Sequence, residues 1–137
     1  MSGEAYTKPI PTITAELAPF FEGAKRNQLL MQRCTACGLH RFPPRELCGA
    51  CLSREREWVP VSGRGEVFSF TVMHQVYHPG FAESVPYAVV LVKLAEGPKF
   101  TSNLVGVAPS EIRIGMPVRV TFEQISPDVT LPKFVPA

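Results

Sequence analysis

Residues 34–51 read Cys-Thr-Ala-Cys-Gly-Leu-His-Arg-Phe-Pro-Pro-Arg-Glu-Leu-Cys-Gly-Ala-Cys, which is the most informative stretch of this chain. It holds all four cysteines of the chain as two short hooks, Cys34-x-x-Cys37 and Cys48-x-x-Cys51. Four thiolates around one ion form the tetrahedral site that suits Zn²⁺, with bonds of roughly 2.3 Å. Two disulfides, or four unrelated buried cysteines, are the alternatives. Because no cysteine is left over, the spacing favours a single metal site.

The predicted metal site also limits the chemistry of the chain. If all four thiols are ligands, no cysteine remains as a nucleophile. Catalytic zinc keeps one open position, whereas four protein ligands fill the tetrahedron, so His40 is not needed as a fifth ligand. We therefore expect a structural metal and no catalytic residue. Iron in the same site, used for electron transfer as in rubredoxin, is the alternative that metal analysis would decide.

Length and composition predict one globular unit. The chain has 137 residues, 45% of them hydrophobic, and a net charge of +2. Residues 1–64 carry nine basic and six acidic side chains, net +3, and the remainder nets −1. This charge distribution lacks the strongly basic patch that is typical of a dedicated nucleic-acid-binding protein. No apolar run reaches the roughly 18 residues of a membrane span, and residues 1–11 have no signal-peptide core, so we expect a cytoplasmic protein.

The first half of the chain reads as an arm, a helix and a ribbon. Thr14 is expected to cap a short helix that runs to about Lys25, with Pro19 and Gly23 as its weak points. Strand-like segments flank the two hooks, which places each hook at the end of paired short strands. These segments are residues 28–32 and 40–45.

The second half reads as strands with little helix between them. Two sets of side chains alternate along residues 65–75, as expected of a strand with two faces. About five such strands in roughly 80 residues predict a small barrel such as an OB-fold, with an open sandwich as the alternative. The two sets are Val67, Ser69, Thr71 and Met73, and Phe68, Phe70, Val72 and His74. The predicted strands are residues 65–75, 87–94, 100–107, 118–122 and 131–135.

Three parts follow from this organisation: an N-terminal arm and helix in residues 1–27, a zinc ribbon in 28–58 and an OB-fold barrel in 59–137. A ribbon of this size buries too little apolar surface to be stable without its metal. Zinc supplies on the order of 10 kcal/mol of folding free energy in such modules. We expect the ribbon and the barrel to pack as one body.

Two segments carry candidate contact residues. Between the hooks, an aromatic residue and two prolines are bracketed by arginines, whose planar cations suit phosphates or carboxylates. After the first long strand comes a loop with three aromatic side chains, and such loops usually contact a ligand or partner. Local packing is the alternative for both segments. The candidates are Arg41, Phe42, Pro43, Pro44 and Arg45 in the first segment, and Tyr77, Phe81 and Tyr87 in the second.

The sequence contains few groups of residues that could form a catalytic site. His74 and His78 are four residues apart, but they lie in a strand end and loop, where this spacing means little. Ser62 does not lie in a nucleophile elbow. A self-sufficient thioesterase is therefore disfavoured, because no nucleophile has a base beside it.

Eight motifs follow one another along nearly the whole chain. They are Gln32-Arg33-Cys34-x-x-Cys37-Gly38, Arg41-Phe42-Pro43-Pro44-Arg45, Cys48-x-x-Cys51, Trp58-x-x-x-Ser62-Gly63-x-Gly65, Phe68-Ser69-Phe70-Thr71-Val72, Pro86-Tyr87, Ile114-Gly115-Met116-Pro117-Val118 and Leu131-Pro132-x-Phe134. In this order they resemble proteins that join an N-terminal helix, a rubredoxin-like zinc ribbon and a C-terminal OB-fold. The resemblance implies a mainly β protein of that architecture.

Members of that family are companions of thiolase-superfamily proteins that act on acyl-CoA, in archaeal mevalonate synthesis, steroid side-chain cleavage and anaerobic aromatic degradation. The resemblance therefore implies a non-catalytic zinc subunit of a hetero-oligomer whose partner carries the catalytic residues. Such a subunit would stabilise the partner and share a coenzyme A thioester as ligand. The arginine–proline segment would then contact the CoA phosphates or the partner, and the aromatic loop would border the acyl chain.

A single-stranded nucleic-acid-binding OB-fold is the alternative from a different class. Such barrels stack bases on aromatic side chains in a basic groove. The barrel half of this chain nets −1, which removes the electrostatic driving force. We therefore expect acyl-CoA and a catalytic subunit as partners, and neither nucleic acid nor membrane.

Overall fold

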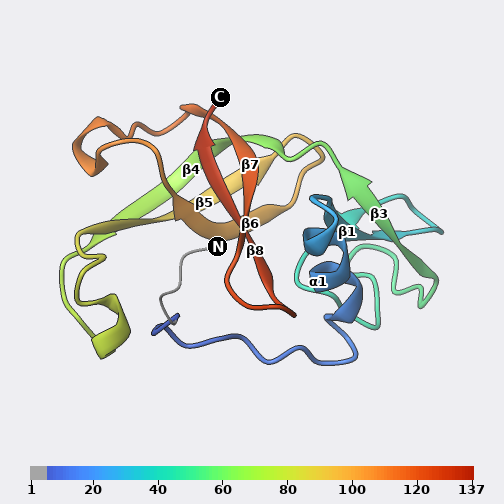
Figure 1. The fold of residues 1–137 in the computed structure, drawn as a ribbon. Coiled ribbons are helices and arrows are strands. Elements are labelled where there is room, and N and C mark those ends of the chain that lie inside the picture. Colours follow the sequence, from blue (N-terminus) through green and yellow to red (C-terminus); the bar gives the residue numbers. More distant parts are fainter. Residues whose placement is uncertain (1–5) are drawn as a thin grey trace.

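The computed structural model describes residues 6–137, which form one short α-helix, a three-stranded sheet and a closed five-stranded barrel (Figure 1). Helix α1 (Ala18–Lys25) packs against strands of both sheets. The predicted mainly β architecture is confirmed, and the closed barrel excludes the open sandwich. The strands are β1 (Leu29–Cys34), β2 (His40–Arg41), β3 (Arg56–Val61), β4 (Arg64–Met73), β5 (Tyr87–Leu94), β6 (Lys99–Leu104), β7 (Pro117–Gln124) and β8 (Thr130–Pro136), with 3₁₀ turns η1 (Pro79–Phe81) and η2 (Pro109–Glu111).

Helix α1 begins at Ala18 and not directly after Thr14, which corrects the predicted start. Thr14 Oγ1 accepts a hydrogen bond from the main-chain N–H of Leu17 at 3.3 Å, so Thr14 caps a turn that precedes the helix. Pro19 lies in the first turn of α1, where its missing N–H costs nothing because the first N–H groups of a helix have no partner. The predicted end at Lys25 is confirmed. No helix in residues 6–137 has the length and apolarity to cross a membrane.

Helix α1 joins the ribbon to the barrel. Gly23 is buried at its contact with β1, where a Cβ would lie 2.6 Å from Leu30 Cγ, so glycine permits the close approach. On the same helix, the Phe20 ring lies 5.0 Å from the Phe42 ring of the ribbon and 5.9 Å from the Phe100 ring of the barrel, between centroids. The expectation that ribbon and barrel pack as one body is confirmed.

The ribbon sheet has the strand order β2-β1-β3, with both pairs antiparallel. The sequence does not predict β3, because Arg56, Glu57 and Pro60 show neither the alternation nor the composition of a strand. β3 nonetheless pairs with β1 along its whole length. The strand predicted over residues 40–45 ends at Arg41, since the two prolines that follow have no N–H to continue the ladder.

The barrel has the strand order β4-β5-β6-β8-β7 and closes between β7 and β4. The shortest strand pairing in the barrel is between β6 and β8, which share the single parallel pair Leu104↔Phe134. Pro132 and Pro136 on β8 lack the N–H groups that a longer ladder would use. Ser102 Oγ donates a hydrogen bond to the Pro132 carbonyl at 2.8 Å and helps to close this seam.

A bulge between Val67 and Ser69 corrects the alternation predicted for β4. Val67 is buried and Phe68 is 46% exposed, whereas Phe70 is half-buried and packs on the core. A bulge adds one residue to a strand, so the inward face switches from the set that contains Val67 to the set that contains Phe70. The two predicted sets therefore do not mark two separate faces.

Candidate metal centre and neighbouring surface

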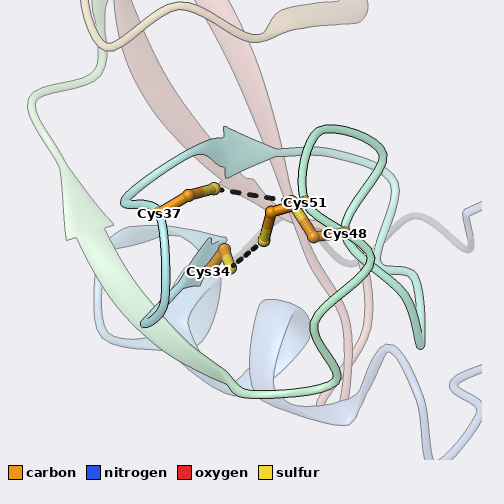
Figure 2. A group of neighbouring side chains, drawn as sticks. All are labelled: Cys34, Cys37, Cys48 and Cys51. Carbon is orange, nitrogen blue, oxygen red and sulfur yellow. Dashed lines mark hydrogen bonds between the residues drawn. The ribbon is translucent and has the colours of Figure 1, made fainter.

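The four cysteines converge on one point from two separate turns (Figure 2). Cys34 ends β1 and Cys37 lies in the turn after it, while Cys48 and Cys51 lie in the loop between β2 and β3. Their Sγ atoms all lie within 4.8 Å of one another, and the Cys34–Cys51 and Cys37–Cys48 sulfurs are 3.6 Å apart. Ligands in a tetrahedron with bonds of about 2.3 Å are about 3.8 Å apart. The four free thiols are therefore positioned to bind a metal, and the disulfide alternative is wrong.

Main-chain N–H groups shift the pKa values of these thiols. The N–H groups of Cys51 and Ala50 point at Cys48 Sγ and lower the pKa of Cys48 to about 6. The Cys37 N–H likewise lowers the pKa of Cys34. The Ser53 N–H lowers the pKa of Cys51, but the Cys34 sulfur, burial and the two other sulfurs outweigh it and raise that pKa to about 12. Without a cation, the cluster therefore keeps the proton on the Cys51 thiol.

The apparent metal affinity is expected to rise with pH. In the folded cluster, before the ion enters, the Cys51 thiol keeps its proton below about pH 12, and metal binding must displace it. Each displaced proton makes the affinity rise about tenfold per pH unit. The slope should steepen below about pH 6, where the Cys48 thiol is also protonated. Competition with a chromophoric chelator across this range measures the slope, and a flat profile would contradict the thiolate site.

Arg41 lies inside the ribbon and not on its surface. Its Nε donates to Gln32 Oε1 at 3.0 Å and its Nη2 donates to the Arg45 carbonyl at 2.9 Å. The same Gln32 oxygen accepts the main-chain N–H of Arg45 at 2.9 Å. Arg41 Nη1 is buried and has no hydrogen-bond partner within residues 6–137. This network holds the segment that leads to the second hook, a role that only the cross-strand pairing of Gln32 with Arg41 reveals.

The Gln32→Met variant is expected to lose about 2–4 kcal/mol of unfolding free energy with metal in excess. Methionine keeps the volume but removes Oε1, which leaves the buried, charged Arg41 Nε and the partly buried Arg45 N–H without an acceptor. Denaturant unfolding measures the loss. The matched control is Gln75→Met in an exposed loop, which should change the stability by less than about 0.5 kcal/mol. Equal stability of the two variants would show that the network contributes nothing.

The rest of the arginine–proline segment divides between interior and surface. Phe42 is half-buried in the aromatic contact with α1, and Pro44 is buried. Pro43 and Arg45 are exposed. Arg45 lines a groove of about 210 Å³ together with His40, beside the ribbon. A ligand or partner approaching this segment would therefore meet Arg45 and Pro43 first.

The aromatic loop and the N-terminal arm together form a larger groove of about 390 Å³. The Phe81 and Tyr87 rings stack with centroids 5.4 Å apart, and Lys8 Nζ lies 5.5 Å from the Phe81 centroid. Tyr6 also lines this groove, whereas Tyr77 is 74% exposed and lies outside its lining. Sequence reasoning missed the arm residues, because nothing in the pattern pairs the arm with a loop so far along the chain.

Comparison with known proteins defines the class to which this ribbon and barrel belong. Residues 21–57 match the family model "ChsH2, rubredoxin-like zinc ribbon domain" and residues 58–123 match "ChsH2, C-terminal OB-fold domain". The class is thus a zinc ribbon followed by an OB-fold, as the sequence predicted. A DUF35 domain-containing scaffold protein of Methanocaldococcus jannaschii is 35% identical over 105 residues, which cover 76% of this chain and 74% of that protein. The chain belongs to this ChsH2/DUF35 family.

The chain is also similar to a solved aldolase structure and to a probable enoyl-CoA hydratase subunit. A solved structure described as "Ltp2-ChsH2(DUF35) aldolase" superposes with a TM-score of 0.84 and 43% identity, over 93% of this chain and 98% of that chain. A probable enoyl-CoA hydratase alpha subunit of Thermomonospora curvata is 44% identical over 130 residues, or 95% of this chain. The chain spans only 40% of the length of that subunit.

Proposed function

We propose that this chain is the non-catalytic, zinc-binding subunit of a thiolase-superfamily complex that breaks or forms carbon–carbon bonds in acyl-CoA by thiolysis or retro-aldol chemistry. The observation that carries the proposal is the similarity along 98% of a chain in the Ltp2-ChsH2(DUF35) aldolase. In this proposal the chain stabilises the catalytic subunit and supplies part of the acyl-CoA site. Aldolase activity is stated for that protein only. A catalytic partner with thiolase or synthase activity would fit the same accessory role for this chain.

The absence of a catalytic constellation within residues 6–137 supports an accessory role. All four cysteines of the chain lie in the metal cluster. His78 Nδ1 accepts the Gly80 N–H at 3.0 Å and so caps η1. Four thiolates also leave a divalent metal without an open position for substrate. Chemistry on a thioester would therefore fall to another polypeptide.

Zinc is the metal that the donor set favours. A closed set of four cysteine sulfurs is typical of structural Zn²⁺, which has no redox chemistry. Thiols of this kind persist in a reducing compartment, so we place the protein in the cytoplasm. Metal analysis of the purified protein tests this assignment, because iron in the site would give visible charge-transfer absorption and would point to electron transfer instead.

Two grooves provide surfaces that suit an acyl-CoA thioester. The groove lined by Phe81 and Tyr87 has aromatic walls for an acyl group and the Lys8 ammonium for an anionic group. Arg45 is exposed and makes no ion pair within the described part of the chain, so its guanidinium is available to a phosphate. In this proposal Tyr77 contacts the partner, because it is 74% exposed and does not line the groove.

Co-expression tests the proposed function. The chain should co-purify with a thiolase-superfamily protein from the same genome, and only the complex should turn over acyl-CoA. Within the complex, Phe81→Ala should raise KM for acyl-CoA about tenfold, since it removes one groove wall. Phe68→Ala removes an exposed ring that does not line the groove and should leave KM unchanged. Turnover by the isolated chain would contradict the accessory role. Salt-dependent binding of a single-stranded oligonucleotide in place of a protein partner would favour the nucleic-acid alternative.

A further inference from the structure

Arg41 carries a buried positive charge that no acidic group in residues 6–137 neutralises. Its side chain belongs to none of the ion pairs in this part of the chain, and the residue is 7% exposed. Its two acceptors, Gln32 Oε1 and the Arg45 carbonyl, are both uncharged, and its Nη1 is buried without an acceptor. A guanidinium keeps its charge in such surroundings, and a buried charge without a counterion is unfavourable. An anion bound nearby would therefore be stabilised.

The groove of about 210 Å³ beside the ribbon brings two more nitrogen-bearing side chains to Arg41. Half-buried His40 and exposed Arg45 line it together with Arg41. The hydrogen bonds of Arg45 within the described residues use only its main-chain N–H and carbonyl, so its guanidinium can donate to a ligand. No acidic residue lines the groove. Its other lining residues are Leu39, Phe42, Gly49 and Pro98.

The main chain around Arg45 is fixed before any ligand binds. Gln32 and Arg41 hold both of its main-chain polar groups. A Cβ added to Gly49 would lie 3.9 Å from Arg45 Nη1, so the guanidinium lies beside a stretch of the second metal hook that has no side chain. Less conformational freedom is therefore lost when Arg45 binds a ligand than for an arginine on a mobile loop.

A phosphate group matches this arrangement in charge and shape. Guanidinium groups bind phosphate oxygens through two parallel N–H bonds, and such charge-assisted bonds are stronger than neutral ones. A phosphate dianion could accept from Arg45 and His40 at once, while its second charge offsets that of Arg41. Pockets for whole ligands have volumes of about 300–1,000 Å³. The smaller groove here suits a single phosphate group, either free or as one end of a larger molecule.

We infer that the groove of His40, Arg41 and Arg45 is a binding site for a phosphate group. Arg45 and His40 donate to its oxygens, and Arg41 supplies a second permanent positive charge. A free phosphate ion and the phosphates of acyl-CoA present the same chemistry. The assignment to acyl-CoA rests on the proposed function, whereas the site itself does not.

Inorganic phosphate added to the isolated, metal-loaded chain tests the site. With pH and ionic strength held constant and chloride as the reference anion, phosphate should raise the midpoint of thermal unfolding, because it binds the folded chain. In an NMR titration, phosphate should also shift the side-chain Nε–H signal of Arg41. No change in either measurement would overturn the inference.

Arg45→Gln is the decisive variant. It removes one charge but keeps both main-chain hydrogen bonds of residue 45, and it should weaken phosphate binding about tenfold or more. Arg119→Gln is the matched control, because Arg119 is an exposed arginine of β7 outside the groove. Its Kd for phosphate should stay within about twofold. Equal weakening in the two variants would overturn the site, since it would reflect net charge alone.

Coenzyme A and its 3′-dephospho form distinguish the two sources of phosphate. If the ligand is acyl-CoA, coenzyme A should displace inorganic phosphate from the isolated chain, and weaker displacement by the dephospho form would assign the 3′-phosphate to the groove. Phosphate binding that coenzyme A does not displace would support the site with free phosphate as its ligand.

The outcomes also separate the inference from the proposed function. A chain that binds phosphate through Arg45 but no thiolase-superfamily protein overturns the proposed function and leaves the site standing. If Arg45→Gln instead weakens the complex with the catalytic subunit while phosphate has no effect on the native chain, the groove takes a carboxylate of the partner, and the phosphate site is overturned.

Discussion

Replacing Cys48 with serine is expected to abolish tight metal binding and to unfold the ribbon. Cys48 is fully buried and its Sγ lies 3.6 Å from that of Cys37, while a serine hydroxyl is a poor ligand for a soft thiolate site. Structural zinc contributes on the order of 10 kcal/mol to such modules, which is comparable to the whole stability of a typical domain. Circular dichroism and bound-metal analysis with and without chelator measure the loss.

A matched variant distinguishes loss of a ligand from disturbance of the hook. Thr35→Ser changes an exposed residue inside the first hook and should keep the metal and the native spectrum. Chelation of the native protein should reproduce the Cys48→Ser spectrum. A chain that stays folded after complete metal removal would refute the structural role of the ion.

Replacing Phe134 with alanine is expected to cost about 3–5 kcal/mol of unfolding free energy. Phe134 is completely buried, and its ring lies 6.2 Å from the Phe100 ring. It also forms with Leu104 the single β6–β8 pair, and its carbonyl accepts the Val105 N–H at 2.8 Å. A cavity here therefore opens the core at the seam where the barrel has the fewest main-chain bonds. Urea unfolding with metal in excess measures the change.

The barrel provides its own control for that experiment. Phe68 is the bulged residue of β4 and is 46% exposed, with Lys99 Nζ 4.0 Å from its ring centroid. Phe68→Ala removes the same ring but leaves no cavity, and should cost less than about 1 kcal/mol. Similar losses in the two variants would mean that the seam is no more sensitive than the surface.

Local chemistry explains which predictions succeed. The hooks are recognisable because each Cys-x-x-Cys spacing brings its two sulfurs together whatever the rest of the chain does. The end of α1 at Lys25 and the strand β5 are likewise visible, from helix and strand patterns in short windows. The start of α1 was misplaced because Thr14 has the residue type of a cap, while the chain uses it in a preceding turn.

Long-range pairing explains what could not be predicted. β3 is a strand because β1 lies beside it, and its own residues do not favour that state. The bulge after Val67 arises from the register with β5. The sequence predicts Arg41 as a surface cation, but its pairing with Gln32 places the Arg41 side chain inside the ribbon. Each of these depends on a neighbour that is distant in sequence.

Spacing and residue type within short stretches of the amino-acid sequence were enough to predict the four cysteines that are positioned to bind a metal, the mainly β class and the family. The tertiary structure was needed to show which candidate contact residues face outward, which groove the arm and the loop share, and that Leu52 is exposed with a positive φ. Burial and backbone angle are properties of the packed chain. They are set by contacts between distant segments, which a linear pattern does not encode.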